Sequence, residues 1–372
     1  MLESSHQRHL HAADERRSPT RKSSDERTIV VVLGTHRSGS SLCAHLLQAL
    51  GIDMADDPDV KESNAKGHWE RAEIMALQDE VLGAFNRDVY SVAHDLPLPS
   101  DWCAQPPTRS VKQRLKQFLR AKLAENALVG FKDPRTVRLL PMWHEIFRDL
   151  SLSPRYVMCL RNPAQVARSL QARDGIAPAL GEYRWLIHVL DFLRYTKNRP
   201  VCIVEYEAWF PEALPNLRKL LDFVGHPSDR EEIDLSVLAS DVVDVALRHD
   251  QTASVVGNTT IRYVYENLRR WDTDPKARHN LEGVLGNLIS FQQLLAPFLE
   301  IIEQHDDAVD RDRESGGLHE ANARLARSLE AERDRLEAAQ AVSAARSGQL
   351  AARLREETQR LAAVREELAG LT

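Results

Sequence analysis

Cysteine is scarce in this chain and is not arranged for metal binding or cross-linking. The 372 residues include four cysteines, and no two of them form a CxxC pair. A zinc site or a disulfide scaffold is therefore not expected. Cys43, Cys159 and Cys202 lie in apolar runs, which is typical of reduced cysteines packed in a core.

Long apolar stretches are missing as well. No run of residues approaches the roughly 18 apolar positions of a membrane span, so we expect none. Residues 1–27 are rich in Ser, Arg, Glu and His and lack the apolar segment of a signal peptide. Their composition predicts a disordered tail, and the chain as a whole is expected to be cytoplasmic.

An excess of positive charge is also absent. The formal net charge is −6, so bulk electrostatics give no reason to expect a nucleic-acid partner. Any anion site must be built locally. The length allows one large α/β domain or two ordinary ones, and a hydrophobic content of 43% is enough for a real core.

What the sequence does contain is an alternation of short β-branched runs and longer helical patterns. The first run, 28–33, ends at a glycine, and similar runs cover 127–132, 155–160 and 201–206. Helical patterns cover roughly 41–50, 69–86, 109–126, 163–173, 182–198 and 212–224. This order predicts an α/β three-layer sandwich of the P-loop NTPase type, with a central parallel sheet of about five strands.

The composition changes near residue 305. Residues 318–372 contain no proline and are dominated by Ala, Arg, Glu and Leu. Apolar residues from Leu350 to Leu371 follow the a and d positions of a heptad, whereas polar residues such as Arg333 and Gln340 occupy core positions upstream. We expect one domain over 28–305 and a long helix or coiled coil over 318–372 that could form a homo-oligomer. A single solvated helix is the alternative.

A loop rich in small residues follows the first strand. It comprises Gly34, Thr35, His36, Arg37, Ser38, Gly39, Ser40 and Ser41. Such a loop between a buried strand and a helix N-terminus directs backbone N–H groups at an anion, and the helix dipole adds positive potential. The alternative is a plain strand–turn–helix connection without a ligand.

The loop lacks the lysine of a nucleoside-triphosphatase motif. That motif ends in Gly-Lys followed by Ser or Thr, but here Ser40 follows Gly39 and the basic residue is Arg37 inside the loop. No strand is followed by an acidic pair suited to magnesium. Both features argue against ATP or GTP hydrolysis, although a P-loop kinase that uses ATP stays open as an alternative.

With these features the loop resembles the 5′-phosphosulfate-binding motif of the P-loop sulfotransferase superfamily. Arg37 takes the position of that motif's basic residue, as in the bacterial and tyrosylprotein branches. The resemblance implies 3′-phosphoadenosine 5′-phosphosulfate (PAPS) as co-substrate. It also implies that no metal is required, because a transferring sulfuryl group carries less negative charge than a phosphoryl group.

A second pair of residues resembles the 3′-phosphate-binding pair of the same superfamily. Arg161 directly follows the run at 155–160, and Ser169 lies eight residues after it. Between them, Asn162 and Pro163 are residue types that favour the start of a helix. Arginine offers a bidentate fork for phosphate and serine a hydroxyl donor. An Arg and a Ser at this spacing often occur by chance. The assignment is supported because the pair follows the Gly-rich loop in the sequence and lies at the end of a strand and in the next helix.

Lys132 lies in a Lys-Asp-Pro segment at the end of another strand, where open α/β sheets place their ligands. By resemblance, this lysine would stabilise charge on the sulfuryl group and the leaving oxygen. Arg135 could assist it or pair with Asp133. A solvated lysine at a strand end is the alternative.

The acceptor must lose a proton as the new bond to sulfur forms, so a base is needed within hydrogen-bond reach. Glu70, in the segment 67–71 that opens the next helical pattern, matches the glutamate that takes this role in tyrosylprotein and many bacterial members. His68 is the rival candidate. Either residue could instead lie on an exposed helix.

The resemblance covers about residues 28 to 300 and weakens after residue 230. An Arg-Lys-Gly loop that closes over the nucleotide in many members is not found, and Arg248 is a poor substitute. We expect a sulfotransferase that transfers a sulfuryl group from PAPS to a hydroxyl or amine. A glycan or glycolipid acceptor is suggested only by the bacterial branch. A degenerate nucleotide domain serving as an interaction protein is a further alternative.

Overall fold

The computed structural model describes most of the chain between residues 27 and 294 and scattered helical positions beyond it. The described residues are 27–57, 67–87, 92–211, 213–225, 235–243, 255–294 and individual positions between 328 and 360. The chain divides into two units, Met1–Leu299 and Glu300–Thr372. The disordered tail was predicted for residues 1–27, which is wrong for Arg27 because this residue begins the first strand. The rest of that prediction, and those for Arg248 and for the composition change near 305, lie outside the described residues.

Four parallel strands form the central sheet in the described part of the chain. They are β1 (Arg27–Leu33), β2 (Val129–Lys132), β3 (Leu152–Leu160) and β4 (Val201–Glu205), in the order β2-β1-β3-β4. The predicted parallel sheet is confirmed. The expected strand count of about five was too high by one for these residues, because they contain only the four β-branched runs seen in the sequence.

The helices fill the intervals between the strands. They are α1 (Ser40–Ala49), α2 (Ala72–Ala84), α3 (Pro106–Glu125), α4 (Leu140–Asp149), α5 (Pro163–Asp174), α6 (Pro178–Tyr195), α7 (Ala213–Val224), α8 (Leu235–Val242) and α9 (Thr259–Arg269). Short 3-10 helices are η1 (Val92–Asp95), η2 (Trp102–Ala104), η3 (Pro134–Val137) and η4 (Glu207–Trp209). Residues 275–294 are also helical.

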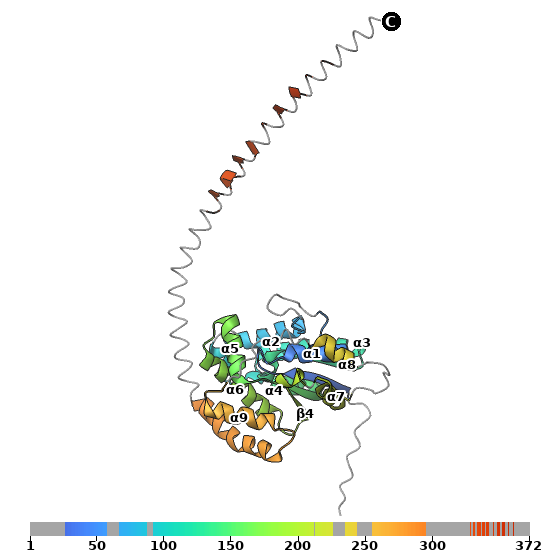
Figure 1. Cartoon of the computed structure of the whole chain (residues 1–372), viewed down its shortest axis with the longest axis vertical. Helices are drawn as coiled ribbons and strands as arrows, with labels where there is room; N and C mark the ends of the chain where they lie inside the picture. The colour runs from blue at the N-terminus through green and yellow to red at the C-terminus, as the bar shows by residue number, and fades with distance from the viewer. Residues whose placement is uncertain are drawn as a thin grey trace, which may run out of the picture. The chain divides into compact units, whose positions relative to one another are not determined.

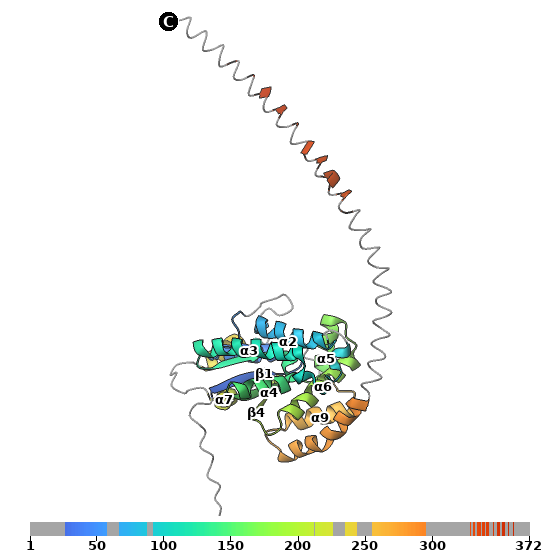
Figure 2. The same cartoon turned by 180° about the vertical axis from the view of Figure 1, so that it is seen from behind.

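Each face of the sheet is covered by its own apolar cluster, which gives three layers. Ile29, Val31 and Leu33 of β1 pack in one cluster with residues of α2, α3, α4 and α6. Val30 and Val32 point the other way and pack with residues of α1, α7 and α8, as the period of a strand requires. Figure 1 shows α1 beside α8 and α6 beside α9, and Figure 2 shows α2 beside α3 from behind.

The order of the strands places a switch point at the end of β1. The chain pairs β1 with β2 on one side and with β3 on the other, and Val32 is in register with both Lys132 and Val157. The loop after β1, the end of β2 and the end of β3 therefore meet at one edge of the sheet. In open α/β sheets, ligands bind at such a crevice.

The second unit is described only at isolated positions. Those residues, between 328 and 360, are helical and exposed, and Arg333 lies 3.8 Å from Glu337 one turn later. The long helix predicted for 318–372 agrees with these positions, whereas its self-association stays a prediction.

The structure also bears on the cysteines, on membrane-spanning helices and on metal-binding groups. All four cysteines are free, and Cys43, Cys159 and Cys202 are buried, as expected for packing residues. None of the helices described is both long and apolar enough to cross a membrane. Among the same residues, no group of three or more His, Cys, Asp or Glu side chains is placed to hold a metal ion.

Candidate functional site

The loop after β1 has a backbone that only particular residues tolerate. Gly39, at the N-cap of α1, has a φ of 86°, and a Cβ there would overlap the ring of Tyr206. Arg37 has a φ of 66°, a left-handed conformation that costs free energy for a residue with a side chain. Strain of this kind is concentrated at functional sites.

Two hydroxyl groups of the loop are buried without a hydrogen-bond partner. Thr35 is 4% exposed and Ser38 is 1% exposed, and neither Thr35 Oγ1 nor Ser38 Oγ has a partner. Native proteins rarely leave buried polar atoms unsatisfied. A bound anion would accept from both hydroxyls, so these atoms fit the group that the loop predicts.

The two predicted anion-binding motifs contact each other through Arg37. Its Nε donates to Ser169 Oγ at 2.8 Å, and Nη1 of Arg161 donates to the carbonyl oxygen of Arg37 at 2.9 Å. The Arg161 guanidinium also lies 4.5 Å from the centre of the Tyr206 ring. Residues 124 and 132 positions apart in sequence are thus brought to one place.

Positive charge gathers around this contact although the chain is acidic overall. Burial lowers the pKa of Arg37, and the neighbouring guanidinium groups of Arg173 and Arg161 lower it further. Burial is the larger effect, and the contribution of the two guanidinium groups is the mutual repulsion of cations. An anion placed between them would relieve that repulsion. The chain is acidic overall, and this cluster of arginines supplies the local positive charge that an anion site needs.

Lys132 and Glu70 form an ion pair at the end of β2. Lys132 Nζ lies 2.6 Å from Glu70 Oε1, and the two side chains are 3% and 14% exposed. Lys132 is therefore not the solvated lysine that was the alternative. The pair places a cation and a carboxylate side by side at the edge where the loop lies.

Glu70 precedes α2 rather than lying on it. The helix was expected from residue 69 but begins at Ala72 with Arg71 as its N-cap. Residues 68–70 therefore lie in the irregular segment before the helix, where His68 and Glu70 are half-buried. The exposed-helix alternative is wrong for both candidate bases. Trp69 has a φ of 56° and stacks on His45 with ring centroids 4.5 Å apart.

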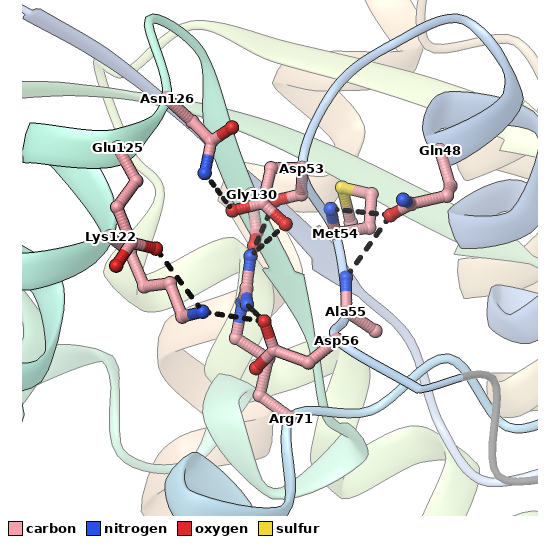
Figure 3. Close-up of polar contacts among 10 residues, drawn as sticks. All are labelled: Gln48, Asp53, Met54, Ala55, Asp56, Arg71, Lys122, Glu125, Asn126 and Gly130. Atoms are coloured by element: carbon pink, nitrogen blue, oxygen red, sulfur yellow. Dashed lines mark hydrogen bonds and ion pairs between the residues drawn. The ribbon is translucent and has the colours of Figure 1, made fainter.

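Arg71, which the sequence analysis missed, ties this segment to the strand that carries Lys132. It is 2% exposed, and its Nε donates to the carbonyl oxygen of Gly130 at 3.2 Å. Its Nη2 donates to the backbone carbonyl of Asp53 at 2.7 Å and lies 2.8 Å from Asp53 Oδ1. Figure 3 shows this guanidinium at the centre of the contacts, with Asp56 on its other side.

We expect Arg71→Met to destabilise the fold by about 3–5 kcal/mol, because it leaves the buried acceptors around Arg71 without their charged donor. The segment that carries Glu70 would at the same time lose its contact with the carbonyl oxygen of Gly130. Chemical denaturation measures the stability. Arg114→Met is the matched control, since Arg114 is half-exposed and pairs with Glu80, and surface pairs contribute about 0–1 kcal/mol. Equal stability of both variants would contradict this role of Arg71.

Arg135 is engaged in structural contacts, including the pairing with Asp133 that was one of the two readings given for it. It lies 2.9 Å from Asp133 and 2.5 Å from Asp79. Asp133 also accepts from Gln78 Nε2 at 2.8 Å, and burial raises its pKa. The Arg135 side chain thus anchors the turn after Lys132 and stabilises a buried carboxylate.

The remaining loop residues are buried or half-buried. Ser40 is 5% exposed and begins α1, whereas Ser41 is half-buried in its first turn. His36 is half-buried, and its Nε2 has no hydrogen-bond partner. Burial lowers the pKa of His36 well below its usual value, with Arg173 as the next cause, so this ring is neutral at pH 7.

Comparison with known proteins gives matches among solved structures only. No protein-family model matches the chain, and no curated protein matches it. The sulfotransferase domain from the curacin biosynthetic pathway is 15% identical, with a TM-score of 0.34 over 69% of this chain and 97% of that chain. The sulfotransferase domain from the Synechococcus PCC 7002 olefin synthase is 17% identical, with a TM-score of 0.34 over 73% of this chain and 98% of that chain.

A sulfotransferase from Alicyclobacillus acidocaldarius is 18% identical, with a TM-score of 0.32 over 58% of this chain and 92% of that chain. A structure described as a kinase from Chloroflexus aurantiacus is 11% identical, with a TM-score of 0.28. The first three bear the name of the superfamily that the sequence motifs resemble.

Proposed function

We propose that this chain is a PAPS-dependent sulfotransferase that acts on a hydroxyl or amine group. The observation that carries the proposal is the contact between the two anion-binding motifs, in which Arg37 bonds to Ser169 and Arg161 bonds to Arg37. A donor with phosphate groups at both its 5′ and 3′ positions requires two anion sites close together. An ordinary ATP site requires only the first.

The residues that would hold the donor follow from their chemistry. The backbone N–H groups and hydroxyls of residues 34–41 suit the 5′-phosphosulfate, and Thr35 and Ser38 supply buried donors that have no other partner. Arg161 and Ser169 suit the 3′-phosphate. When bound, PAPS supplies an activated sulfuryl group with a good leaving group.

The ion pair supplies the two groups that sulfuryl transfer needs. Glu70 accepts the proton of the acceptor hydroxyl while the acceptor oxygen forms a bond to sulfur. The bond between sulfur and the bridging oxygen breaks, and its electron pair stays on that oxygen, which leaves with the 5′-phosphate. Lys132 and Arg37 offset the negative charge that develops there. His68 is the second candidate for the base.

Direct contact between base and cation is compatible with both roles. A carboxylate has about four lone-pair sites, so Glu70 can accept from Lys132 and from an acceptor hydroxyl at once. Lys132 has three N–H donors, of which one is used by Glu70 at 2.6 Å. The other two would donate to a sulfuryl oxygen or to the leaving oxygen of a bound donor.

The two alternatives explain fewer of these contacts. A P-loop kinase needs a lysine after Gly39, and Ser40 stands there. Burying the Lys–Glu pair at the sheet edge costs desolvation free energy. A degenerate interaction protein would not require such a pair. The tyrosylprotein-like or bacterial branch, the cytoplasmic location and a metal-free reaction are part of the proposal.

We expect Arg161→Ala to weaken binding of 3′-phosphoadenosine 5′-phosphate (PAP) by about 1.5–3 kcal/mol, the value of a hydrogen bond to a charged group. Binding of ADP, which lacks the 3′-phosphate, should barely change. Isothermal calorimetry with both nucleotides measures this, and Arg114→Ala serves as a control at an exposed arginine. Equal losses for PAP and ADP would overturn the assignment of Arg161.

A further inference from the structure

A cavity with a volume of about 370 Å³ opens between four parts of the chain. Its wall is built from the segment 97–103, the turn and helix around η3 and α4, the end of α6, and the end of the helix 275–294. Pockets for small organic ligands measure about 300–1,000 Å³, so this cavity has room for such a molecule. None of the residues proposed to hold the donor or to act in transfer belongs to its described wall.

The wall of this cavity reaches from solvent into the interior of the protein. Three lining residues, Ser100, Arg194 and Gln293, are exposed and lie where the cavity meets solvent. Two others, Trp102 and Asp191, are only 6% and 9% exposed and lie deeper. A ligand can therefore enter from solvent and still contact side chains that are largely buried.

The apolar part of the wall consists largely of rigid rings. Three are the pyrrolidine rings of Pro97, Pro99 and Pro141, and two are the aromatic rings of Trp102 and Tyr195. Such rings present flat apolar faces, and aromatic side chains pair favourably with further aromatic rings in offset-stacked or edge-to-face arrangements. The shape and chemistry of the wall therefore favour a flat aromatic molecule.

Most of the charged groups in the wall are already paired. Asp191 Oδ2 lies 3.1 Å from Arg138 Nε, and the two side chains are 12% and 2% exposed. Glu145 Oε2 lies 2.6 Å from Lys112 Nζ. Each of these two pairs is neutral as a whole, so neither gives the cavity a net charge.

Arg194 supplies the one charge that is left over in the described wall. Its guanidinium carbon lies 5.2 Å from the centre of the Tyr195 ring, a cation–π contact that leaves the positive charge in place. It lies in no ion pair with a residue that the structure describes, although its charge helps to lower the pKa of Asp191, which burial raises. A negative group of a ligand is attracted to this end of the cavity, and an ammonium group is repelled.

We propose that this cavity is a second ligand site, separate from the donor site, and that it takes a flat aromatic molecule with one anionic group, such as an aromatic carboxylate. The aromatic body packs among the prolines, Trp102 and Tyr195, and the carboxylate pairs with Arg194 where the cavity meets solvent. The inference goes beyond the proposed function and does not depend on it, because the cavity and the donor site share no residue.

The test is a calorimetric titration of the full chain with 2-naphthoate. Its neutral and cationic counterparts are 2-naphthylmethanol and protonated 2-naphthylmethylamine, which carry the same ring system. We expect 2-naphthoate to bind, the alcohol to bind about 3–5-fold more weakly, which is the contribution of one exposed ion pair, and the amine to bind more weakly still. Saturation with PAP should leave the affinity for 2-naphthoate unchanged.

Two variants at exposed positions place the bound probe. Arg194→Met should weaken binding of 2-naphthoate by about 3–5-fold and leave binding of the alcohol unchanged. Arg148→Met is the matched control, since Arg148 is an exposed arginine of α4 outside the cavity wall. Ser100→Trp should weaken binding of all three probes, because the larger side chain fills the entrance.

Four results would overturn the proposal. They are the absence of 2-naphthoate binding, equal or tighter binding of the amine, displacement of 2-naphthoate by PAP, and a loss in Arg148→Met as large as that in Arg194→Met. If Ser100→Trp fails to fold, the comparison of Arg194→Met with Arg148→Met decides alone. Failure of the chain to bind PAP would count against the proposed function and leave this test intact.

Discussion

Lys132→Ala should lower kcat by about 10²–10³-fold, the effect of removing one preorganised group that stabilises developing charge. Lys132 is 3% exposed and lies at the carboxyl end of β2. Its charge acts most strongly where negative charge appears on the leaving oxygen, which is only in the transition state. Affinity for PAP should therefore change by less than about 3-fold. Transfer of labelled sulfur from PAPS measures kcat, and calorimetry measures PAP affinity.

Lys112→Ala is a matched control for this variant. Lys112 is 13% exposed and lies 2.6 Å from Glu145, so it is also a salt-bridged lysine of low exposure, but it lies on α3. Its replacement should leave kcat unchanged. If Lys132→Ala keeps its rate and loses only affinity for PAP, Lys132 binds the ground state and the proposed mechanism is wrong.

Glu70→Gln should lower kcat by about 10²–10⁴-fold, the usual contribution of a general base. The amide retains an oxygen that can accept from Lys132, so the local contacts change little. Loss of rate would then report the missing base rather than a displacement of the segment before α2. The transfer rate at saturating PAPS and acceptor measures this effect, with the melting temperature as a check on the fold.

His68→Gln separates the two candidate bases. His68 lies two residues before Glu70 and is also half-buried, so the pair of variants perturbs one segment in two places. We expect His68→Gln to retain most of its activity. An inactive His68→Gln protein beside an active Glu70→Gln protein would transfer the role of base to His68.

Much of the fold could be predicted because local patterns decide it. A short β-branched run such as 28–33 is typical of a strand that is buried on both faces in a parallel sheet. The residue types of Asn162 and Pro163 predicted the start of α5, and Asn162 Oδ1 indeed accepts from the backbone N–H of Ala164 at 2.9 Å. The convergence of Gly34, Lys132 and Arg161 follows from parallel strands that end at the same edge.

The rest depends on contacts between residues far apart in the sequence. Nothing in the segment 67–71 shows that Arg71 reaches the carbonyl oxygen of Gly130, 59 residues away, and so fixes the segment that carries Glu70 before the helix. The neighbouring Glu70, as a candidate base, indicated only that this segment belongs to the site, not that Arg71 has a structural role. Which hydroxyls of a Ser- and Thr-rich loop are left without partners also depends on the folded backbone.

The approach of His94 to His188, whose ring centroids lie 5.8 Å apart, could not be predicted for the same reason. His94 and His188 are 94 residues apart in sequence, and neither belongs to a motif. Tyr206 is a similar case, since its place over Gly39 is visible only once β4 lies beside β3.

The most direct test of the central claim is a calorimetric titration of the wild-type chain with PAP, ADP and ATP in the presence of a metal chelator. The two joined anion sites predict that PAP binds at least about 10-fold more tightly than ADP or ATP, since a hydrogen bond to a charged group contributes about 1.5–3 kcal/mol. Equal affinity for PAP and ADP, or preferential binding of ATP that requires magnesium, would contradict a PAPS-dependent sulfotransferase and favour the kinase.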